Sequence, residues 1–345
     1  MTPTISVIVV TYNQEDTIAR TFDSILAQRC HAPIEIVIGE DGSTDGTRLV
    51  CQQYVGRYSD KIRLMPQKPN KGVVNNYMDC LLAARGTFIA DCAGDDYWID
   101  PEKLEKELRL MEQDDQITLV HTGWNWFDVR TGNARPNIFT PFPETVTDGK
   151  EMLESILTAT QAPVVHLCTA LYRASTIRQI YKEKTHLFRG VELVCEDLQI
   201  TFTLAAMGKI AYLPDLTLNY SYGKESISNQ GEGRAAEGKQ FVFTRRATDL
   251  AFRLMTEYHL TPSTKLKDFF AFRAYSQLMH AFRLHDHHLF LEAQSCIDDW
   301  QVVPTRRIKL LQGIMSRPML WTFMLHIRNV VVCLKHFITR RVSIR

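Results

Sequence analysis

Residues 5–13 read ISVIVVTYN, a nearly continuous apolar and β-branched run that ends in a polar Thr-Tyr-Asn. Such a run is typical of a strand that is covered on both faces, as in a parallel sheet. It is too short for the apolar core of a secretion signal, and no basic residue precedes it. We therefore expect a strand here rather than a targeting segment.

Strand-like and helix-like patterns alternate from this run onward. Similar apolar runs recur at 34–38, 62–65 and 87–90, with helical spacing of apolar residues between them at 16–27, 47–58 and 72–84. This alternation predicts an α/β fold with a Rossmann-like, mostly parallel sheet flanked by helices. Ligands of such sheets bind beyond the carboxyl ends of the strands.

The rest of the chain continues this pattern and then becomes helical. The further expected elements are a helix at 101–112, a strand at 118–127, a loop excursion at 128–148, a helix at 151–158, a strand at 164–172, a helix at 196–207, strands at 210–213 and 216–222, and helices at 240–258, 265–283, 289–300 and 319–338. We expect an α/β domain at 1–225, a linker or mobile loop at 226–238, and a helical C-terminal extension at 239–345.

Composition narrows the class of protein. With 45% hydrophobic and 23% charged residues, the chain is close to the average globular protein, which excludes intrinsic disorder. A net charge of +1 argues against a dedicated nucleic-acid partner. The eight cysteines show neither C-x-x-C nor zinc-finger spacing, so we expect buried thiols in a reducing cytoplasm. The sequence contains no run of 18 apolar residues, so we do not expect a transmembrane helix.

Three acidic clusters follow predicted strands or open a predicted helix. They read EDGSTDG at 40–46, GDDYW at 94–98, and Glu196-Asp197. Neighbouring carboxylates repel one another, and a divalent cation or a hydrogen-bonding ligand offsets that cost. A single pair is more often a solvated turn or a helix cap, but the order and spacing of all three favour a shared site.

Together with SVIVVTYNQ and the stretch that surrounds GDDYW, these clusters resemble the catalytic domain of the family 2 glycosyltransferases, of the bacterial surface-polysaccharide type. The resemblance covers about residues 4–222. It implies the GT-A fold and an inverting enzyme that takes a sugar from a nucleotide-sugar donor, with UDP as the first choice of nucleotide. The implied acceptor is a hydroxyl of a glycan or of a lipid-linked acceptor.

The resemblance also implies roles for residues in the first two clusters. Thr11, Tyr12 and Asn13 match the segment that holds the nucleotide base, although a polar turn would explain them too. Asp41 matches the acidic residue that accepts a hydrogen bond from the base. Asp95, also on the nucleotide side, and Asp96 match the motif that binds Mn²⁺ or Mg²⁺ over the diphosphate.

One position departs from the family pattern. Many members have an acidic residue where this chain has Ala93, so metal ligation rests on Asp95 and Asp96. Asp91 shares a face with Ala93 if the strand continues, but it lies roughly 7 Å further back and is not counted as a substitute.

The third cluster matches the motif that supplies the catalytic base. We expect Asp197 to take the proton from the acceptor hydroxyl, with Glu196 as the competitor for this role.

Tyr97 and Trp98 directly follow the metal motif, at a place where aromatic faces can stack on sugars. Packing in the core is the alternative explanation for these two residues. His166 and Cys168 lie on an apolar strand and are more simply explained as core residues than as lining of the acceptor pocket.

The C-terminal region differs in charge from the rest of the chain. Residues 301–345 hold nine Lys/Arg and no Asp or Glu, while the first 300 hold 31 basic and 39 acidic residues. The predicted helix at 319–338 has a broad apolar face, a basic polar face and a Trp, as interfacial helices do. We expect it to bind an anionic membrane surface, which would place the protein at the cytoplasmic face of the cell membrane. A helix packed on the acidic body is the alternative.

Two other functions remain as alternatives. Ala93 is compatible with a nucleotide-binding or scaffold module that has lost catalysis. A nucleotidyltransferase would have a loop rich in Gly and basic residues after the first strand, where this chain has TYNQEDT at 11–17.

Overall fold

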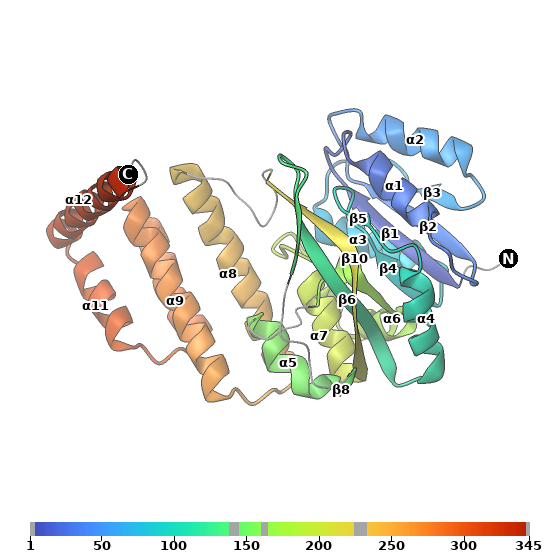
Figure 1. Cartoon of the computed structure of the whole chain (residues 1–345). Coiled ribbons are helices and arrows are strands. Elements are labelled where there is room, and N and C mark those ends of the chain that lie inside the picture. Colours follow the sequence, from blue (N-terminus) through green and yellow to red (C-terminus); the bar gives the residue numbers. More distant parts are fainter. Residues whose placement is uncertain (1–3, 138–144, 160–164, 224–232, 343–345) are drawn as a thin grey trace. The chain divides into compact units, whose positions relative to one another are not determined.

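The computed structural model describes residues 4–137, 145–159, 165–223 and 233–342, with side chains described as far as Val331. The chain divides into two compact units, residues 1–224 and 225–345. Each unit is described by itself (Figure 1).

The first unit is a ten-stranded sheet with helices on both faces. In chain order its elements are β1 (Ile5–Thr11), α1 (Ile18–Leu26), β2 (Ile34–Glu40), α2 (Thr47–Arg57), β3 (Ile62–Leu64), α3 (Val73–Ala83), β4 (Phe88–Asp91), β5 (Tyr97–Trp98), α4 (Lys103–Gln113), β6 (Ile117–Asp128), β7 (Ala134–Pro136), β8 (Val146–Asp148), α5 (Gly149–Thr158), η1 (Leu167–Thr169), β9 (Ala170–Arg173), α6 (Ala174–Glu183), η2 (Thr185–Leu187), α7 (Asp197–Met207) and β10 (Lys209–Tyr222).

The strand order is β3-β2-β1-β4-β9-β6-β10-β5, with β7 on β6 and β8 on β10. Strands β1 to β4 are parallel, and Val7 of β1 lies between Ile36 of β2 and Ala90 of β4. Strand β9 runs antiparallel to both β4 and β6, so β6 and its parallel neighbour β10 point the same way as β4. The carboxyl ends of β1, β2, β4, β6 and β10 therefore meet at one edge of the sheet.

Helices cover both faces of this sheet (Figure 1). Helices α1 and α2 pack together, with the rings of Phe22 and Tyr54 4.9 Å apart. The connection through α3 reverses the direction of winding and places that helix on the opposite face, where Tyr77 hydrogen-bonds to Tyr172 of β9. The core between the layers is mainly apolar, with β1 residues Ile5, Val7, Ile8 and Val9 at 0–1% exposure.

The predicted fold class, α/β with a mostly parallel sheet flanked by helices and a helical C-terminal part, is confirmed. Several details differ. Strand β5 was not predicted, and the segment expected as a loop at 128–148 contains the short strands β7 and β8. The segment expected as a strand at 164–172 is described from residue 165, as a 3-10 turn followed by the short β9. The two closing strands are one strand, β10, with register shifts between Leu213 and Leu218. Helix α6 was not predicted.

The second unit is helical as expected. Its described elements are α8 (Arg234–Glu257), α9 (Thr264–Leu284), α10 (His287–Asp299), α11 (Arg306–Met315) and α12 (Pro318–Val342). Residues 234–238, predicted as part of the linker, instead form the first turn of α8, because Arg-Ala-Ala-Glu favours a helix more than the glycines at either side disfavour it. Residues 226–232 of that prediction lie outside the described residues.

Helix α12 is anchored to its own unit through Trp321, which is 3% exposed. The Trp321 indole Nε1 donates to the Phe282 carbonyl at 3.1 Å, and its ring packs against those of His285 and Phe290. None of the helices in the described residues is long and apolar enough to span a membrane.

Candidate active site

The loop after β1 is tied to the loop after β2. Asn13 adopts a left-handed backbone conformation (φ 54°), which asparagine tolerates better than most residues. Its Oδ1 accepts from the Thr44 backbone N–H at 2.8 Å, and its own N–H donates to Ser43 Oγ at 3.0 Å. Thr11 is buried, whereas the Tyr12 side chain beside it is 46% exposed. Tyr12 therefore offers an aromatic ring at the rim of the sheet edge.

Asp41 lies beside this loop and is 5% exposed. Its backbone N–H donates to the Thr11 carbonyl at 3.0 Å, which joins the ends of β1 and β2. Its two carboxylate oxygens accept from the backbone N–H groups of Lys71 and Gly72 at 3.1 and 3.0 Å. Burial raises the pKa of this carboxyl, although those two N–H groups act in the opposite direction. Each oxygen keeps a second lone pair that can accept from a ligand.

The second acidic motif is held by two residues that the sequence analysis missed. The Asp95 carbonyl accepts from Arg20 Nη2 at 3.0 Å and from Ser221 Oγ at 2.6 Å. The Ser221 N–H donates to Asp96 Oδ1 at 2.8 Å. Arg20 faces the motif from α1 and Ser221 from the end of β10. Only the position of Ser221 near the end of a predicted strand hinted at such a role.

Asp96 is buried and suits a hard dication. Its Oδ2 makes no hydrogen bond of normal geometry within the described part of the chain, although the Cys168 thiol is near enough to lower the carboxyl pKa. Burial and the charge of Asp95 nevertheless raise that pKa well above its usual range. Adjacent carboxylates with a buried, underused oxygen fit Mg²⁺ or Mn²⁺, which prefer oxygen ligands. Ala93 supplies only its backbone, whose N–H donates to Cys168 Sγ at 3.4 Å.

Tyr97 and Trp98 have different environments. The Arg20 guanidinium lies over the Tyr97 ring, 4.0 Å from its centroid, and the Asn219 amide donates to the Tyr97 hydroxyl at 2.6 Å. Trp98 is 4% exposed, its Nε1 donates to the Cys168 carbonyl at 3.0 Å, and the buried Lys103 ammonium lies 4.7 Å from its ring. The expectation that Trp98 stacks on a sugar is wrong, because its ring is enclosed in the core.

The third motif opens α7, with Glu196 as the N-cap residue and Asp197 as the first helical residue. Burial raises the pKa of both carboxyls, and the charge of Asp197 raises that of Glu196 further. Asp91, at the end of β4, lies near this pair. Burial raises the pKa of the Asp91 carboxyl well above its usual range, and the charges of Glu196 and Asp197 contribute. Asp91 thus lies on the side of the third motif.

Cys168 connects the second and third motifs. Burial raises the pKa of its thiol, and the charges of both Asp96 and Asp197 add to this shift. The two carboxylates, 101 positions apart in the sequence, therefore lie close to one thiol. His166 caps the short turn that holds Cys168, with Nδ1 accepting from the Cys168 N–H at 3.3 Å. Burial lowers the pKa of His166 to about 4, so its ring is neutral at physiological pH.

A group of aromatic side chains adjoins His166 and was not predicted. Neighbouring strands β6 and β10 contribute alternate residues that point to one face, so Trp126 lies opposite Tyr220. The rings of this aromatic cluster contact one another edge to face at centroid distances of 4.7–5.9 Å: Trp124, Trp126, His166, Tyr220 and Tyr222. The W-x-W and Y-x-Y spacings at these two strand ends were the available signal.

The segment that follows β10 is also of interest for donor binding. By position, the family resemblance implies that Lys224 and the polar residues 226–230 close over the donor diphosphate, but these residues lie outside the described part of the chain.

Comparison with known proteins agrees with this geometry. The model of the family "Glycosyl transferase family 2" matches residues 6–181. Two relatives from Bacillus subtilis are the putative glycosyltransferase EpsE, 37% identical over 142 residues, and the putative teichuronic acid biosynthesis glycosyltransferase TuaG, 38% identical over 109 residues. These matches cover 40% and 32% of this chain, and 50% and 42% of the relatives. The chain thus matches half or less of the length of each.

Among solved structures, S. aureus TarS 1–349, determined in complex with UDP-GlcNAc, superposes with a TM-score of 0.52 over 90% of each chain. The sequence identity is 16%, so this likeness concerns the fold. It shows that the two chains share a fold. The family model covers just over half of the chain and spans the first two acidic motifs, and on that ground the chain belongs to glycosyltransferase family 2.

Proposed function

We propose that this chain is a metal-dependent, inverting glycosyltransferase that moves a sugar from a nucleotide-sugar donor, UDP-linked in the first instance, to a hydroxyl of a glycan or lipid-linked acceptor. The observation that carries the proposal is the convergence of acidic motifs from distant parts of the sequence at the carboxyl edge of one sheet. TarS, which shares the fold, was crystallised in complex with UDP-GlcNAc, and this supports the donor class.

The donor side is assigned to the first two motifs. Tyr12 and Asn13 would contact the base beside Thr11, and Asp41 would accept a hydrogen bond from it. Asp96, together with Asp95, would hold Mg²⁺ or Mn²⁺ against the diphosphate. Bound there, the ion would stabilise the charge that develops on the departing nucleoside diphosphate.

The acceptor side is assigned to the third motif. Asp197 is the proposed general base, and Glu196 is the competitor. An inverting transfer requires a carboxylate that removes the acceptor proton as the hydroxyl oxygen attacks the anomeric carbon. Burial raises the pKa of Asp197, which makes its carboxylate a stronger base than an exposed aspartate. Burial also raises the pKa of the neighbouring Asp91 carboxyl well above its usual range.

The aromatic cluster on β6 and β10 suits a carbohydrate acceptor. Its member His166 caps the turn that holds Cys168, the thiol close to both Asp96 and Asp197. Trp126, Tyr220 and Tyr222 are half-buried, so part of each ring remains available, and aromatic faces pack well against the C–H faces of sugars. Trp126→Ala should raise KM for a glycan acceptor several-fold while hydrolysis of the donor without acceptor stays unchanged. Equal loss of both reactions would argue against an acceptor role.

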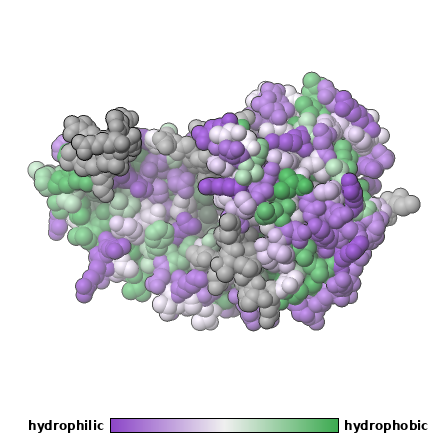
Figure 2. Space-filling view, viewed as in Figure 1, coloured by the Kyte–Doolittle hydropathy of each residue, from purple (hydrophilic) through white to green (hydrophobic). Residues whose placement is uncertain are grey.

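Helix α12 is the proposed contact with an anionic membrane. Its exposed apolar side chains follow a helical stripe: Met319, Phe323, Ile327, Val330 and Val331. Figure 2 shows hydrophobic surface where α11 and α12 lie, at the left of the view. The side chains from residue 332 onward, including Lys335, lie outside the described residues. The stripe supports attachment at the cytoplasmic membrane face, where residues 1–225 would act on surface-polysaccharide precursors, in keeping with the name of TuaG.

The alternative is a nucleotide-binding or scaffold module that has lost catalysis, and it is suggested by Ala93 in place of an acidic residue. Incubation with a panel of nucleotide sugars, in Mg²⁺ or Mn²⁺ and again in excess chelator, separates the two. The proposal predicts release of a nucleoside diphosphate from one donor class only when metal is present. Tight donor binding without release, with a range of glycan acceptors supplied, would favour the module.

A further inference from the structure

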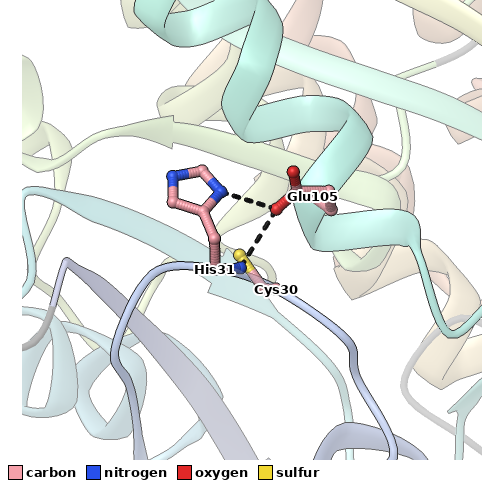
Figure 3. A group of neighbouring side chains, drawn as sticks. All are labelled: Cys30, His31 and Glu105. Atoms are coloured by element: carbon pink, nitrogen blue, oxygen red, sulfur yellow. Dashed lines mark hydrogen bonds and ion pairs between the residues drawn. The ribbon is translucent and has the colours of Figure 1, made fainter.

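A second group of potential metal ligands lies away from the acidic motifs. Cys30 and His31 are in the loop between α1 and β2, and Glu105 is in the first turn of α4 (Figure 3). One ligand atom from each residue (Cys30 Sγ, a His31 ring nitrogen and a Glu105 oxygen) lies within 4.8 Å of the other two. Figure 3 shows the imidazole and the carboxylate facing each other, with the sulfur beside them.

These distances are close to those of a zinc site. Zinc bonds of about 2.0–2.3 Å in tetrahedral geometry separate ligand atoms by about 3.3–3.6 Å. His31 Nδ1 and Glu105 Oε2 are 2.7 Å apart, so a metal would push this pair slightly apart and draw the sulfur inward. The His31 side chain is 56% exposed, so its rotation provides such movement without a change in the backbone.

The groups around the three residues supply the second observation. Arg109 Nε donates to Glu105 Oε1 at 2.8 Å, which leaves Oε2 directed at His31. On the other side of the imidazole, His31 Nε2 lies 3.7 Å from Glu112 Oε1. Metal-bound histidines almost always donate the remaining ring N–H to a carboxylate, carbonyl or water. Glu112 therefore lies near the ring nitrogen that a zinc-bound His31 would leave free, although at 3.7 Å the two atoms are not hydrogen-bonded.

Charge is also balanced for a dication. A Cys30 thiolate, Glu105 and Glu112 carry three negative charges, and Arg109 carries one positive charge, which leaves −2. A thiolate and an imidazole favour zinc over magnesium, whereas the Asp95–Asp96 pair offers only oxygen. The two places would therefore select different ions.

We propose that Cys30, His31 and Glu105 bind one Zn²⁺, with a water as the fourth ligand. The ion acts as a clip between the α1–β2 loop and α4. Hydrogen bonds already join these segments: the Arg29 N–H donates to the Pro101 carbonyl at 2.7 Å, and Gln28 Nε2 donates to the Asp100 carbonyl at 2.8 Å. Since Asp100 and Pro101 directly follow β5, the clip steadies the segment that carries the second acidic motif.

Equilibrium dialysis of the full, tag-free chain against Zn²⁺ in excess Mg²⁺, followed by metal analysis, tests the proposal. We expect one zinc per chain in the wild type and close to none in Cys30→Ser and His31→Asn. His288→Asn is the matched control, because His288 forms an exposed pair with Glu292 on α10, with Nδ1 and Oε1 3.0 Å apart. This control should retain the zinc.

Cobalt substitution gives an independent readout. Co²⁺ at the site should show a thiolate charge-transfer band in the near ultraviolet and the visible bands of tetrahedral cobalt. Cys30→Ser should abolish the charge-transfer band. A zinc content that does not change in Cys30→Ser, or a wild-type cobalt complex without a thiolate band, overturns the proposal and leaves a hydrogen-bonded His–Glu contact.

Discussion

Asp197 and Glu196 are adjacent carboxylates with different proposed roles. Asp197→Asn keeps the size of the side chain but cannot accept a proton, so transfer should fall by ~10²–10⁴-fold, the usual contribution of a general base. Donor affinity should change little, because the residue faces the acceptor. Steady-state transfer rates and donor titration measure the two effects. Glu196→Gln, measured alongside, should cost less, and a reversed order of the two variants would transfer the base assignment to Glu196.

The pH profile gives a second readout of the same group. The base must be deprotonated to act, and burial raises the pKa of Asp197. The acid limb of kcat/KM should therefore rise with increasing pH through a midpoint above about 4, the ordinary aspartate value. A midpoint at or below that value would show that the base is not a buried carboxylate.

Gly94 lies where the second motif packs against the loop after β1 and the start of α1. A Cβ at this position would come within 2.7 Å of Thr11 Oγ1 and 2.9 Å of Ile18 Cδ1. Gly94→Ala should destabilise the fold by about 1–3 kcal/mol and weaken donor binding, because the loop that carries Asp95 must move. Urea unfolding and donor titration measure both effects.

The control for Gly94 is Gly56→Ala in α2, where a Cβ would meet nothing within 4 Å. This change should stabilise the helix by about 0.5–1 kcal/mol. If the two variants behaved alike, close packing of the second motif against the loop after β1 would not be what requires a glycine at position 94.

Single residues also mark the limits of the sequence analysis. The positions of Asp41, Asp96 and Asp197 at strand ends or a helix start followed from local pattern and family resemblance. The burial of Trp98 did not, because it depends on Lys103 and on the Cys168 carbonyl, which are distant or unremarkable in the sequence. The contact of Arg20 with the second motif could not be predicted either, because Arg20 and Asp95 are 75 positions apart in the sequence.

At the scale of elements, α12 is the helix with the most exposed apolar surface to explain. Phe323 is 60% exposed and Ile327 is 41% exposed on one side of it. Phe323→Ser with Ile327→Ser should reduce sedimentation with anionic vesicles several-fold at low salt, since both side chains would otherwise enter the interface. High salt should weaken binding of the wild type by screening its basic residues.

Substitutions test α12 better than deletion of residues 317–345, because deletion also removes the buried Trp321. Leu310→Ser on α11 is the matched control, since Leu310 is 67% exposed but lies outside the stripe. The proposed membrane role would be contradicted if the wild-type protein did not bind anionic vesicles at low salt. It would also be contradicted if the double variant on α12 and Leu310→Ser lost vesicle binding equally.

Elements with strong local periodicity could be predicted, and short or tertiary-dependent ones could not. The buried runs that became β1, β2 and β4 are mostly apolar, as is typical of strands covered on both faces. Strand β9 has four residues and pairs antiparallel between β4 and β6, and no local signal specifies such pairing. Helix α6 follows β9 directly, and no glycine or proline separates the two, so no boundary between them is visible in the sequence.

At the scale of the whole molecule, chain topology creates the site. Reversal of winding after β3 brings β4 beside β1, and the antiparallel β9 restores the direction of β6 and β10. As a result, carboxylates from the first half of the first unit meet Glu196 and Asp197 from the second half. The proposed donor and acceptor groups all lie in residues 1–224, the first of the two units.

In the proposed function, turnover of the donor depends on a metal ion. This dependence is tested by the rate at which nucleoside diphosphate is released from the preferred donor, measured as a function of Mn²⁺ concentration. The rate is compared between the wild type, Asp96→Asn and Asp115→Asn. Asp115 has a fully exposed carboxylate paired with Arg173 and serves as the control. We predict metal-dependent release in the wild type and in the control, and a fall of at least ~100-fold in Asp96→Asn, the scale on which loss of one transition-state contact acts. Undiminished release by Asp96→Asn, or by the wild type in excess chelator, would contradict the proposed function.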